Sequence, residues 1–380
     1  MIKRVFLFLA LLSILLSSCA PKAAGSDKRV IAVTGALTGP FAQDGGDIKR
    51  GAELAVANIN GSGGINGKQI ELITEDDRSD PKEAANVANK LVNDSRVLAV
   101  IGHYNSSCTL AGAPIYNKAG LLEVTAGSTS PAVSQAGPYT FRVIVTDAFQ
   151  GDVVTRWMVE EYGHKKVAIM WENDDYGAGL RDVISASVKK YGGEVVGVES
   201  YIFGETKDFA SSITKLRALN PDALFIAGLY TEGSLIAKQA AAVDWTPPIF
   251  GVDGLYTPAY IELGGKAVEG TIVVGFFHES STDPLVQKFI KDYEAKVGAK
   301  PSTYAAYGYD AMMILAEAIK NVGPDRTKMM EYLTTLKDFK GVTGATTFDE
   351  NGDCIKSPLK LTIRRYVDFS KSLHNPLIFL

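Results

Sequence analysis

Short apolar runs alternate with segments of helical periodicity along nearly the whole chain. An apolar run at residues 29–37 is followed by residues 48–60, in which apolar side chains recur every three or four positions, and a second such pair follows at residues 68–77 and 79–94. Strands that alternate with helices in this way indicate βαβ units and a parallel sheet. The first part of the chain is therefore predicted to be an α/β unit.

The helix expected within residues 79–94 has a clear start. Asp80 can cap it, Pro81 suits the first helical position, and Glu83 stands three residues after the cap, as in a capping box. The pattern predicts a helix that begins at Pro81.

A second series of elements restarts near residue 148 and has the same order as the first. Its strands are expected at residues 165–171, 194–201, 221–228 and 247–254, and its helices at 151–163, 179–192, 208–220 and 233–243. The two halves repeat an architecture without repeating residues, so the pattern predicts two similar α/β lobes. After a strand at 271–277 the chain is expected to be helical over about residues 284–336.

The last part of the chain, residues 346–366, contains a turn that allows two interpretations. Asp349, Asn351 and Asp353 alternate like the start of a calcium-binding loop, but Cys354 stands where that loop needs glycine and Lys360 where it needs glutamate. The sequence Asp-Glu-Asn-Gly at 349–352 is typical of a turn between two strands. We expect a β-hairpin and no metal site.

The first residues have the layout of a secretory signal peptide. Lys3 and Arg4 precede an apolar run that is too short to span a bilayer. Residues 16–19, Leu-Ser-Ser-Cys, resemble the lipobox of bacterial lipoproteins, although an ordinary signal with a chance cysteine is the alternative. We expect a signal peptide at 1–18, lipidation at Cys19, a flexible tether at 19–28, and a mature protein anchored outside the cytoplasmic membrane.

Composition narrows the class of protein. About 350 residues follow the leader, which is more than one hydrophobic core normally serves and suggests two domains. The formal net charge of −4 argues against a nucleic-acid partner. No later stretch is long and apolar enough to predict a membrane span. Cys108 and Cys354 could form a disulfide in an exported protein, but two isolated cysteines are not a disulfide framework.

The segment His-Tyr-Asn-Ser-Ser-Cys at 103–108 joins a predicted strand to a predicted helix and offers a nucleophile, a metal site or a binding site. Dinucleotide, P-loop, hydrolase and metalloprotease motifs are absent from the sequence. The histidines at positions 103, 164, 278 and 374 are scattered, and three of them stand in apparent loops or element ends, where a histidine is more often a surface residue than a base. The carboxylates at 75–77 suggest solvated or capping groups. Because a serine nucleophile needs a base, we expect neither an enzyme nor a cofactor.

The same joint suits a binding site. Ligands of open α/β sheets collect at the carboxyl ends of strands, where the next helix offers free amides, so Ser106 and Ser107 can add hydroxyl donors for a carboxylate. The simpler alternative is that one serine caps the helix. A second joint at residues 126–131 again brings hydroxyls and a glycine to a strand end. In the other half, Asp253 could meet a cation. This combination predicts an α-amino acid as the ligand.

The chain as a whole resembles the extracytoplasmic amino-acid-binding proteins of branched-chain amino acid ABC transporters, which have the type I periplasmic binding protein fold. The motifs that carry the resemblance are GALTGP, GAELAVANINGSGGINGKQIELITEDDRSDP, VIGHYNSS, TAGSTSP, DDYGAGL, FGVDG and TYAAYGYDAMMILAEAI. The resemblance implies two doubly wound parallel-sheet lobes joined by three strands near residues 146, 275 and 345. It implies an N-terminal lobe of residues 29–146 plus 276–345 and a C-terminal lobe of residues 147–275 plus 346–380.

The resemblance also implies roles for individual residues. The α-carboxylate would be held by Ser106, Ser107 and Thr129, and the ammonium by the Gly127 carbonyl and Asp253. The residues around the ligand side chain or over the cleft would be Tyr104, Tyr176, Tyr230 and Asp44. The implied function is a monomeric receptor that captures a free amino acid and delivers it to membrane permease subunits. A sensory module of the same fold is the alternative.

Two departures from the family pattern concern the substrate. Leucine-binding members commonly have an aromatic residue where this chain has Asp44, so a larger, polar or basic ligand side chain becomes an option beside branched-chain amino acids. Related receptors for amides, urea and aromatic acids are a further alternative. The usual disulfide would join the positions of Arg78 and Asn105, so Cys108 is not its remnant and is expected to be a small packed residue.

Overall fold

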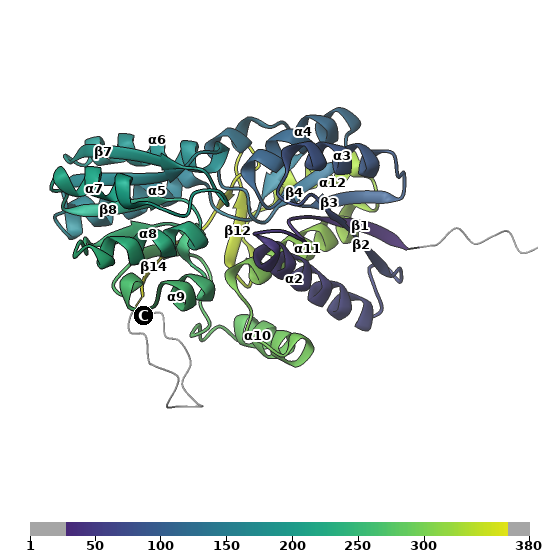
Figure 1. Cartoon of the computed structure of the whole chain (residues 1–380). Coiled ribbons are helices and arrows are strands. Elements are labelled where there is room, and N and C mark those ends of the chain that lie inside the picture. Colours follow the sequence, from purple (N-terminus) through teal and green to yellow (C-terminus); the bar gives the residue numbers. More distant parts are fainter. Residues whose placement is uncertain (1–27, 364–380) are drawn as a thin grey trace, which may run out of the picture.

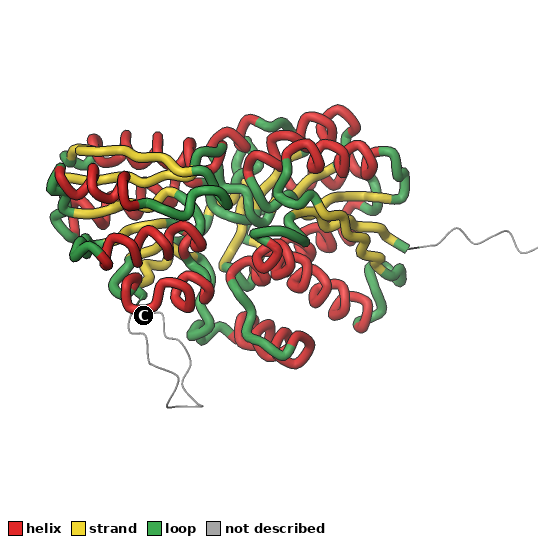
Figure 2. The backbone as a smooth tube through the Cα atoms, viewed as in Figure 1, coloured by secondary structure: helices red, strands yellow, loops and turns green. Residues whose placement is uncertain are grey.

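Two open α/β sheets lie side by side in the computed structural model, which describes residues 28–363 (Figures 1 and 2). The first sheet has the order β2-β1-β3-β4-β5, and all its neighbouring strands are parallel. Its strands are β1 (Arg29–Gly35), β2 (Ile70–Asp76), β3 (Val97–Ile101), β4 (Leu122–Thr125) and β5 (Thr140–Arg142). Helices α2 (Ala42–Gly61), α3 (Pro81–Val92) and α4 (Ser106–Ala119) connect them.

The second sheet has the order β14-β10-β9-β8-β6-β7 and is parallel except for its edge strand β14. Its strands are β6 (Lys166–Glu172), β7 (Glu194–Tyr201), β8 (Ala223–Ala227), β9 (Ile249–Gly251), β10 (Ile272–Gly275) and β14 (Leu359–Thr362). Its helices are α5 (Asp147–Arg156), which continues as a π-helical turn at Trp157–Glu161, α6 (Asp175–Lys190), α7 (Ala210–Ala218), α8 (Tyr230–Ala242) and α9 (Pro258–Gly264).

Helices cover both faces of the second sheet, which explains the continuously apolar stretches of its inner strands. Along β6, Val167 and Ile169 pack in one hydrophobic cluster, whereas Ala168 and Met170 pack in another on the opposite face. Side chains alternate between the faces of a strand, so a strand buried on both faces needs apolar residues at every position. The parallel sheets predicted from the alternation of strands and helices are therefore present, with helices on both faces of the second sheet.

The late helical block packs on the first sheet. It contains α10 (Pro284–Val297), α11 (Thr303–Val322) and α12 (Arg326–Thr335), and α11 runs against α2 (Figure 1). The two backbones touch where glycines stand: a Cβ on Gly51 would lie 1.9 Å from the carbonyl oxygen of Ala305, and one on Gly308 would lie 2.1 Å from that of Ile48. This close contact fixes the first two turns of α11 beside the middle of α2.

A small antiparallel sheet lies between the two large ones. Its strands are β11 (Phe339–Gly341), β12 (Gly344–Phe348) and β13 (Cys354–Ile355). Phe348 pairs with Cys354, so the predicted hairpin around residues 349–352 is confirmed. The predicted cap of α3 is also confirmed, because the side chain of Asp80 accepts hydrogen bonds from the amides of Lys82 and Glu83. The first long helix begins at Ala42, earlier than the expected residue 48.

The chain passes from one large sheet to the other three times. The first two passages lie between β5 and α5 and between β10 and α10, near the expected residues 146 and 275. The third lies later than residue 345, because Gly352 still accepts a hydrogen bond from the amide of Arg142 in β5 and only β14 pairs with β10. The division into lobes remains a proposal, and these contacts favour a final boundary at about residues 356–358.

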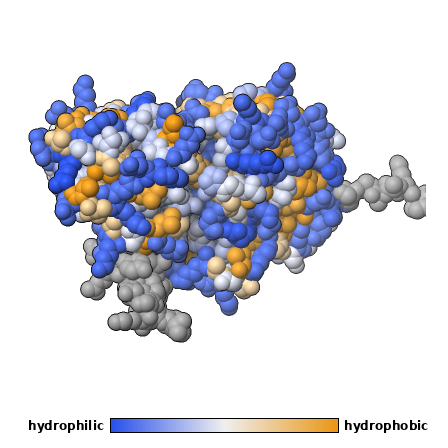
Figure 3. All heavy atoms as spheres, viewed as in Figure 1, coloured by the Kyte–Doolittle hydropathy of each residue, from blue (hydrophilic) through white to orange (hydrophobic). Residues whose placement is uncertain are grey.

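Some of the sequence predictions lie outside the described residues. These are the signal peptide, the tether up to residue 27, the lipidation site Cys19, and residues 364–380 of the proposed C-terminal lobe. Within residues 28–363, no helix combines the length and apolar character needed to cross a bilayer. The face in Figure 3 is mainly hydrophilic, with apolar residues in scattered groups. Cys108 and Cys354 are both buried and both free, so no disulfide joins them.

Candidate functional site

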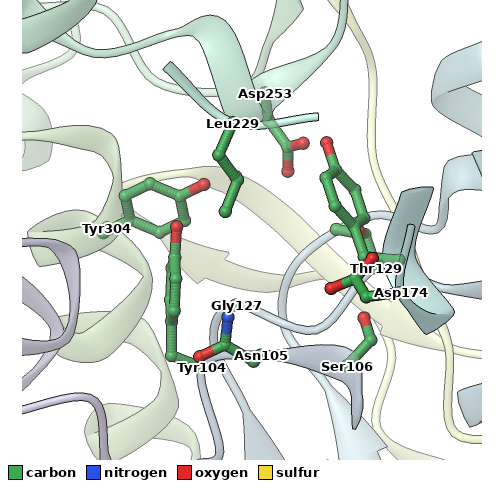
Figure 4. Close-up of a pocket in the computed structure, with 10 residues that line it drawn as sticks. Tyr104, Asn105, Ser106, Gly127, Thr129, Asp174, Leu229, Asp253 and Tyr304 are labelled. Atoms are coloured by element: carbon green, nitrogen blue, oxygen red, sulfur yellow. The ribbon is translucent and has the colours of Figure 1, made fainter. Parts of the chain in front are cut away.

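A pocket lies where the carboxyl ends of the two sheets face each other (Figure 4). Its cavity volume is about 20 Å³, little more than one water molecule needs. The lining side chains come from both sheets and from α11: Tyr104, Asn105, Ser106, Gly127, Thr129, Asp174, Tyr176, Leu229, Asp253 and Tyr304. Six of these were predicted from the sequence. Asn105, Asp174, Leu229 and Tyr304 were not assigned to the ligand, and Ser107, Tyr230 and Asp44 do not line this pocket.

The first joint, between β3 and α4, brings Ser106 to the pocket. Ser106 is the first residue of α4, and its Oγ accepts a hydrogen bond of 3.2 Å from the amide of Ser130. The expectation that a serine caps this helix is wrong, because Asn105 is the N-cap residue and its side chain makes no capping bond. The helix start therefore keeps free amides beside the Ser106 hydroxyl, which is a favourable environment for a carboxylate.

The second joint follows β4 and is bonded to the first. The Thr125 hydroxyl donates to the carbonyl of His103 at 2.6 Å, and Ser128 Oγ donates to the carbonyl of Tyr104 at 3.1 Å. Glycine is needed at position 127, since a Cβ there would lie 2.6 Å from the Tyr104 ring and 2.8 Å from its carbonyl oxygen. Thr129, two residues further, is held at the pocket wall by this arrangement.

An arginine for which the sequence predicted no role supports this second joint. Arg142 in β5 donates from Nη1 to the carbonyls of Ser128 at 3.2 Å and Ser130 at 3.0 Å, on either side of Thr129. Its Nε lies 2.5 Å from Oδ1 of Asp353, and the Arg142 side chain is 1% exposed. A charged residue inside the apolar strand Phe-Arg-Val-Ile-Val was the available signal, but its partner is more than 200 positions away.

A surface position for His103 is wrong, whereas for Asp77 only the solvated alternative is wrong, because its Oδ1 accepts a hydrogen bond of 2.9 Å from the Ser79 amide. Both side chains are fully buried, and His103 Nδ1 lies 2.6 Å from Asp77 Oδ2 while Nε2 lies 3.2 Å from the Tyr116 hydroxyl. His103 is therefore not a surface residue, and Asp77 is not solvated. The neighbouring Asp76 also caps, because it accepts from the amide of Leu37 at 2.9 Å. This buried pair of His103 and Asp77 holds His103 in place, and His103 is the residue that precedes Tyr104 in the first joint.

The second lobe contributes carboxylates to the site. Asp253 follows β9, is 3% exposed, and accepts a hydrogen bond of 3.0 Å from Gln150 Nε2. Burial raises the pKa of Asp253 to about 6. Asp147, at the start of α5, is buried with both oxygens unpartnered, and burial and the charge of Asp253 raise its pKa well above the usual range. Asp174 caps α6 through the amide of Gly177 at 2.8 Å, and burial raises its pKa to about 6.

Aromatic side chains close the remaining sides of the pocket. Tyr176 in the first turn of α6 is 7% exposed, and its hydroxyl has no hydrogen-bond partner. Tyr304, in the first turn of α11, packs edge-on against Tyr104 with ring centroids 5.2 Å apart. Leu229 lines the pocket, whereas Tyr230, the next residue and the first of α8, does not. Tyr304 was hard to predict because its motif lies far along the chain from the rest of the site.

The two lobes touch beside the pocket. The ring of Phe41, just before α2, stacks on that of Phe203, just after β7, with centroids 4.0 Å apart. The Ser130 hydroxyl donates to the carbonyl of Asp175 at 3.0 Å. These contacts join loops of different sheets across the cleft, so they belong to the arrangement in which the lobes are close together.

The site as a whole has hydroxyl and amide donors on one side and the carboxylates of Asp174 and Asp253 on the other. Cys108 is not a reactive thiol, because it is fully buried in α4 and burial raises its pKa well above the usual range. Among residues 28–363 no cluster of His, Cys, Asp and Glu has the arrangement of a metal site. The geometry suits the binding of a small zwitterion.

Comparisons with known proteins give one consistent result. The family described as periplasmic binding protein matches residues 30–361. An amino acid binding protein of Pseudomonas aeruginosa is 35% identical over 332 residues, which cover 85% of this chain and 87% of that protein.

Two solved structures are also similar to this chain. A leucine-binding protein of Thermotoga maritima has a TM-score of 0.82 and 34% identity, with 88% of this chain and 95% of that chain covered. The branched-chain amino acid transporter substrate-binding protein of Streptococcus pneumoniae, in complex with isoleucine, has a TM-score of 0.83 and 31% identity, with 89% and 96% covered.

Proposed function

This chain belongs to the periplasmic binding protein family, and from this membership we propose its function. The resemblance and the fold class predicted from the sequence are confirmed, and the protein is a substrate-binding receptor and not an enzyme. Beyond that, we propose that it captures a free α-amino acid, branched-chain or related, between its lobes. Relatives named for leucine, isoleucine and valine support this class of ligand.

The observation that carries the proposal is the opposition of Ser106 and Thr129 to Asp253 across one pocket (Figure 4). An α-amino acid has a carboxylate and an ammonium on the same carbon, and both need partners when water is excluded. In the proposal, Ser106, Thr129 and the free amides of Ser107 and its neighbours hold the carboxylate. The Gly127 carbonyl and Asp253 hold the ammonium, and Tyr176 covers the ligand.

The small cavity implies movement on binding. About 20 Å³ cannot hold an amino acid, so the lobes must separate to admit the ligand and close again around it. The carboxylate binds one lobe first, and contacts from the other lobe then favour the closed form only when ligand is present. The stack of Phe41 on Phe203 would be made in that closed form.

We further propose that the protein acts outside the cytoplasmic membrane, anchored through a lipid on Cys19, and that the closed form delivers its ligand to membrane permease subunits. The sequence at residues 1–19 supports the export and anchoring steps. We propose that it acts as a monomer.

Calorimetry of the purified protein against each of the twenty amino acids tests the proposed function. At least one should bind with micromolar or tighter affinity, and Ser106→Ala should weaken that binding by about tenfold through loss of one hydrogen bond to a charged group. Absence of any micromolar binder among the twenty would refute the assignment to amino acids.

A further inference from the structure

Asp44 is a buried carboxylate with one oxygen unused. It lies in the first turn of α2 and is 1% exposed. Its Oδ2 accepts a hydrogen bond of 2.9 Å from the Tyr104 hydroxyl, while Oδ1 has no partner. A buried carboxylate oxygen without a hydrogen-bond donor is unfavourable, so a donor that reaches Oδ1 of Asp44 would be stabilising there.

None of the basic side chains among residues 28–363 donates to this oxygen. Arg50, the nearest arginine along α2, pairs with Asp47 at 2.5 Å, and Ser302 donates to the other oxygen of Asp47 at 2.8 Å. Within the described part of the chain, the groups that act on Asp44 are Tyr104 and the like charge of Asp47, and burial together with that charge raises the pKa of Asp44 to about 7.

Aromatic rings pack against Tyr104, whose hydroxyl donates to Asp44. Phe41 and Tyr304 lie 5.7 Å and 5.2 Å from Tyr104, centroid to centroid. Burial and, second, the charge of Asp44 raise the pKa of the Tyr230 hydroxyl to about 12. Aromatic faces combined with a carboxylate favour a cationic nitrogen over an aliphatic group, because the ring quadrupole and the charge act in the same direction.

Tyr104 connects the pocket to Asp44. The backbone of Tyr104 lies beside Ser106, which is proposed to bind the ligand carboxylate, and its hydroxyl donates to Asp44. The carboxylate site and Asp44 are therefore separated by about the length of a tyrosine side chain. Figure 4 shows the hydroxyls of Tyr104 and Tyr304 together, on the side of the pocket away from Ser106. The side chain of a bound lysine or arginine is long enough to cover this distance to Asp44, whereas the side chain of a bound serine or threonine is too short.

We propose that the ligand of this receptor is an α-amino acid whose side chain ends in a cationic nitrogen, and that Asp44 with its aromatic neighbours binds that nitrogen. The inference rests on the proposed function, because it requires the α-carboxylate and α-ammonium to be held by Ser106, Thr129 and Asp253. The close contact of α2 with α11 through Gly51 and Gly308 fixes Asp44 and Tyr304 relative to each other.

Titration calorimetry at pH 8, where Asp44 is ionised, tests the inference with L-lysine, L-arginine, L-leucine and L-isoleucine. The wild type should bind lysine or arginine at least tenfold more tightly than leucine. Asp44→Asn, which keeps the size and one acceptor, should lose at least tenfold for the cationic ligand and gain or keep affinity for leucine. Asp182→Asn, which removes an exposed charge on α6, is the matched control and should change neither.

The outcomes separate this inference from the function on which it rests. Binding of leucine or isoleucine tenfold tighter than of lysine and arginine, or a cationic affinity unchanged in Asp44→Asn, overturns the inference and leaves the amino-acid receptor intact. No binding of any amino acid overturns both. If Asp44→Asn does not fold, the ranking of the four ligands by the wild type decides.

Discussion

Arg142 and Asp353, 211 positions apart in the chain, form an ion pair of 2.5 Å between Nε and Oδ1. The pair joins the hairpin turn before β13 to the strand that supports the second ligand joint. Because Arg142 also donates to the carbonyls of Ser128 and Ser130, the geometry around Thr129 depends on a residue in a distant turn.

Asp353→Ala should therefore reduce both stability and ligand affinity. The variant leaves the guanidinium of Arg142 buried without its partner, and the expected loss is roughly 3–5 kcal/mol in the free energy of unfolding. Chemical denaturation measures this loss. Glu350→Ala, in the same turn but exposed, is the control and should stay within about 0.5 kcal/mol of the wild type. A loss below about 1 kcal/mol for Asp353→Ala would contradict the supporting role of the pair.

Asp253→Asn should weaken ligand binding without unfolding the protein. The amide keeps an acceptor for Gln150 but loses the charge proposed to meet the ammonium, so the expected cost is about 2 kcal/mol, or ~30-fold in Kd. Calorimetry with the tightest of the twenty amino acids measures it, with Asp182→Asn as the exposed control. An unchanged Kd would remove Asp253 from the site.

The same variant should have an opposite effect on the stability of the ligand-free protein. The pKa of Asp253 is raised from 3.8 to about 6, so the folded state holds a proton that the unfolded state has released between these values. This proton-linked stability is complete below pH 3.8 and is lost as the pH rises through about 6. Thermal melting should find Asp253→Asn more stable than the wild type at pH 7.5, with the difference shrinking toward pH 5. A difference independent of pH would contradict the buried ionised carboxylate.

Phe203→Ala should accelerate ligand release. The stack of Phe203 on Phe41 joins the lobes only when they are close, and an aromatic pair of this kind contributes about 1 kcal/mol. Stopped-flow displacement should find koff raised by ~5-fold, with kon nearly unchanged, because the contact forms after the ligand has entered. Ile202→Ala, at a side chain 50% exposed, serves as the control. An equal change of koff in both variants would count against the stack as a closing contact.

The residues that could be predicted from the sequence lie at local joints. Ser106, Thr129 and Asp253 each follow the carboxyl end of a strand, and the pattern of strands and helices alone brings such positions to one edge of a sheet. Leu229 and Tyr230 mark the limit of this reasoning: they are neighbours at a helix start, where one position changes the direction of a side chain by about 100°.

The residues that could not be predicted depend on contacts between distant segments. Tyr304 reaches the pocket because α11 returns to α2, and Arg142 finds Asp353 because the hairpin at residues 349–352 folds back onto β5. His103 and Asp77 looked like unrelated polar residues, yet they meet in the interior. Sequence spacing does not encode such pairings, since they follow from the packing of whole elements.

The two free thiols have a practical consequence. Cys108 and Cys354 are buried, and burial raises the pKa of the Cys354 thiol to about 11 and that of Cys108 further. Both stay in the thiol form at neutral pH and react slowly with maleimides. When the protein is prepared without residues 1–27, a single cysteine introduced at the rim of the cleft would be the reactive one, and a fluorophore attached there would turn lobe closure into an optical signal for its ligand.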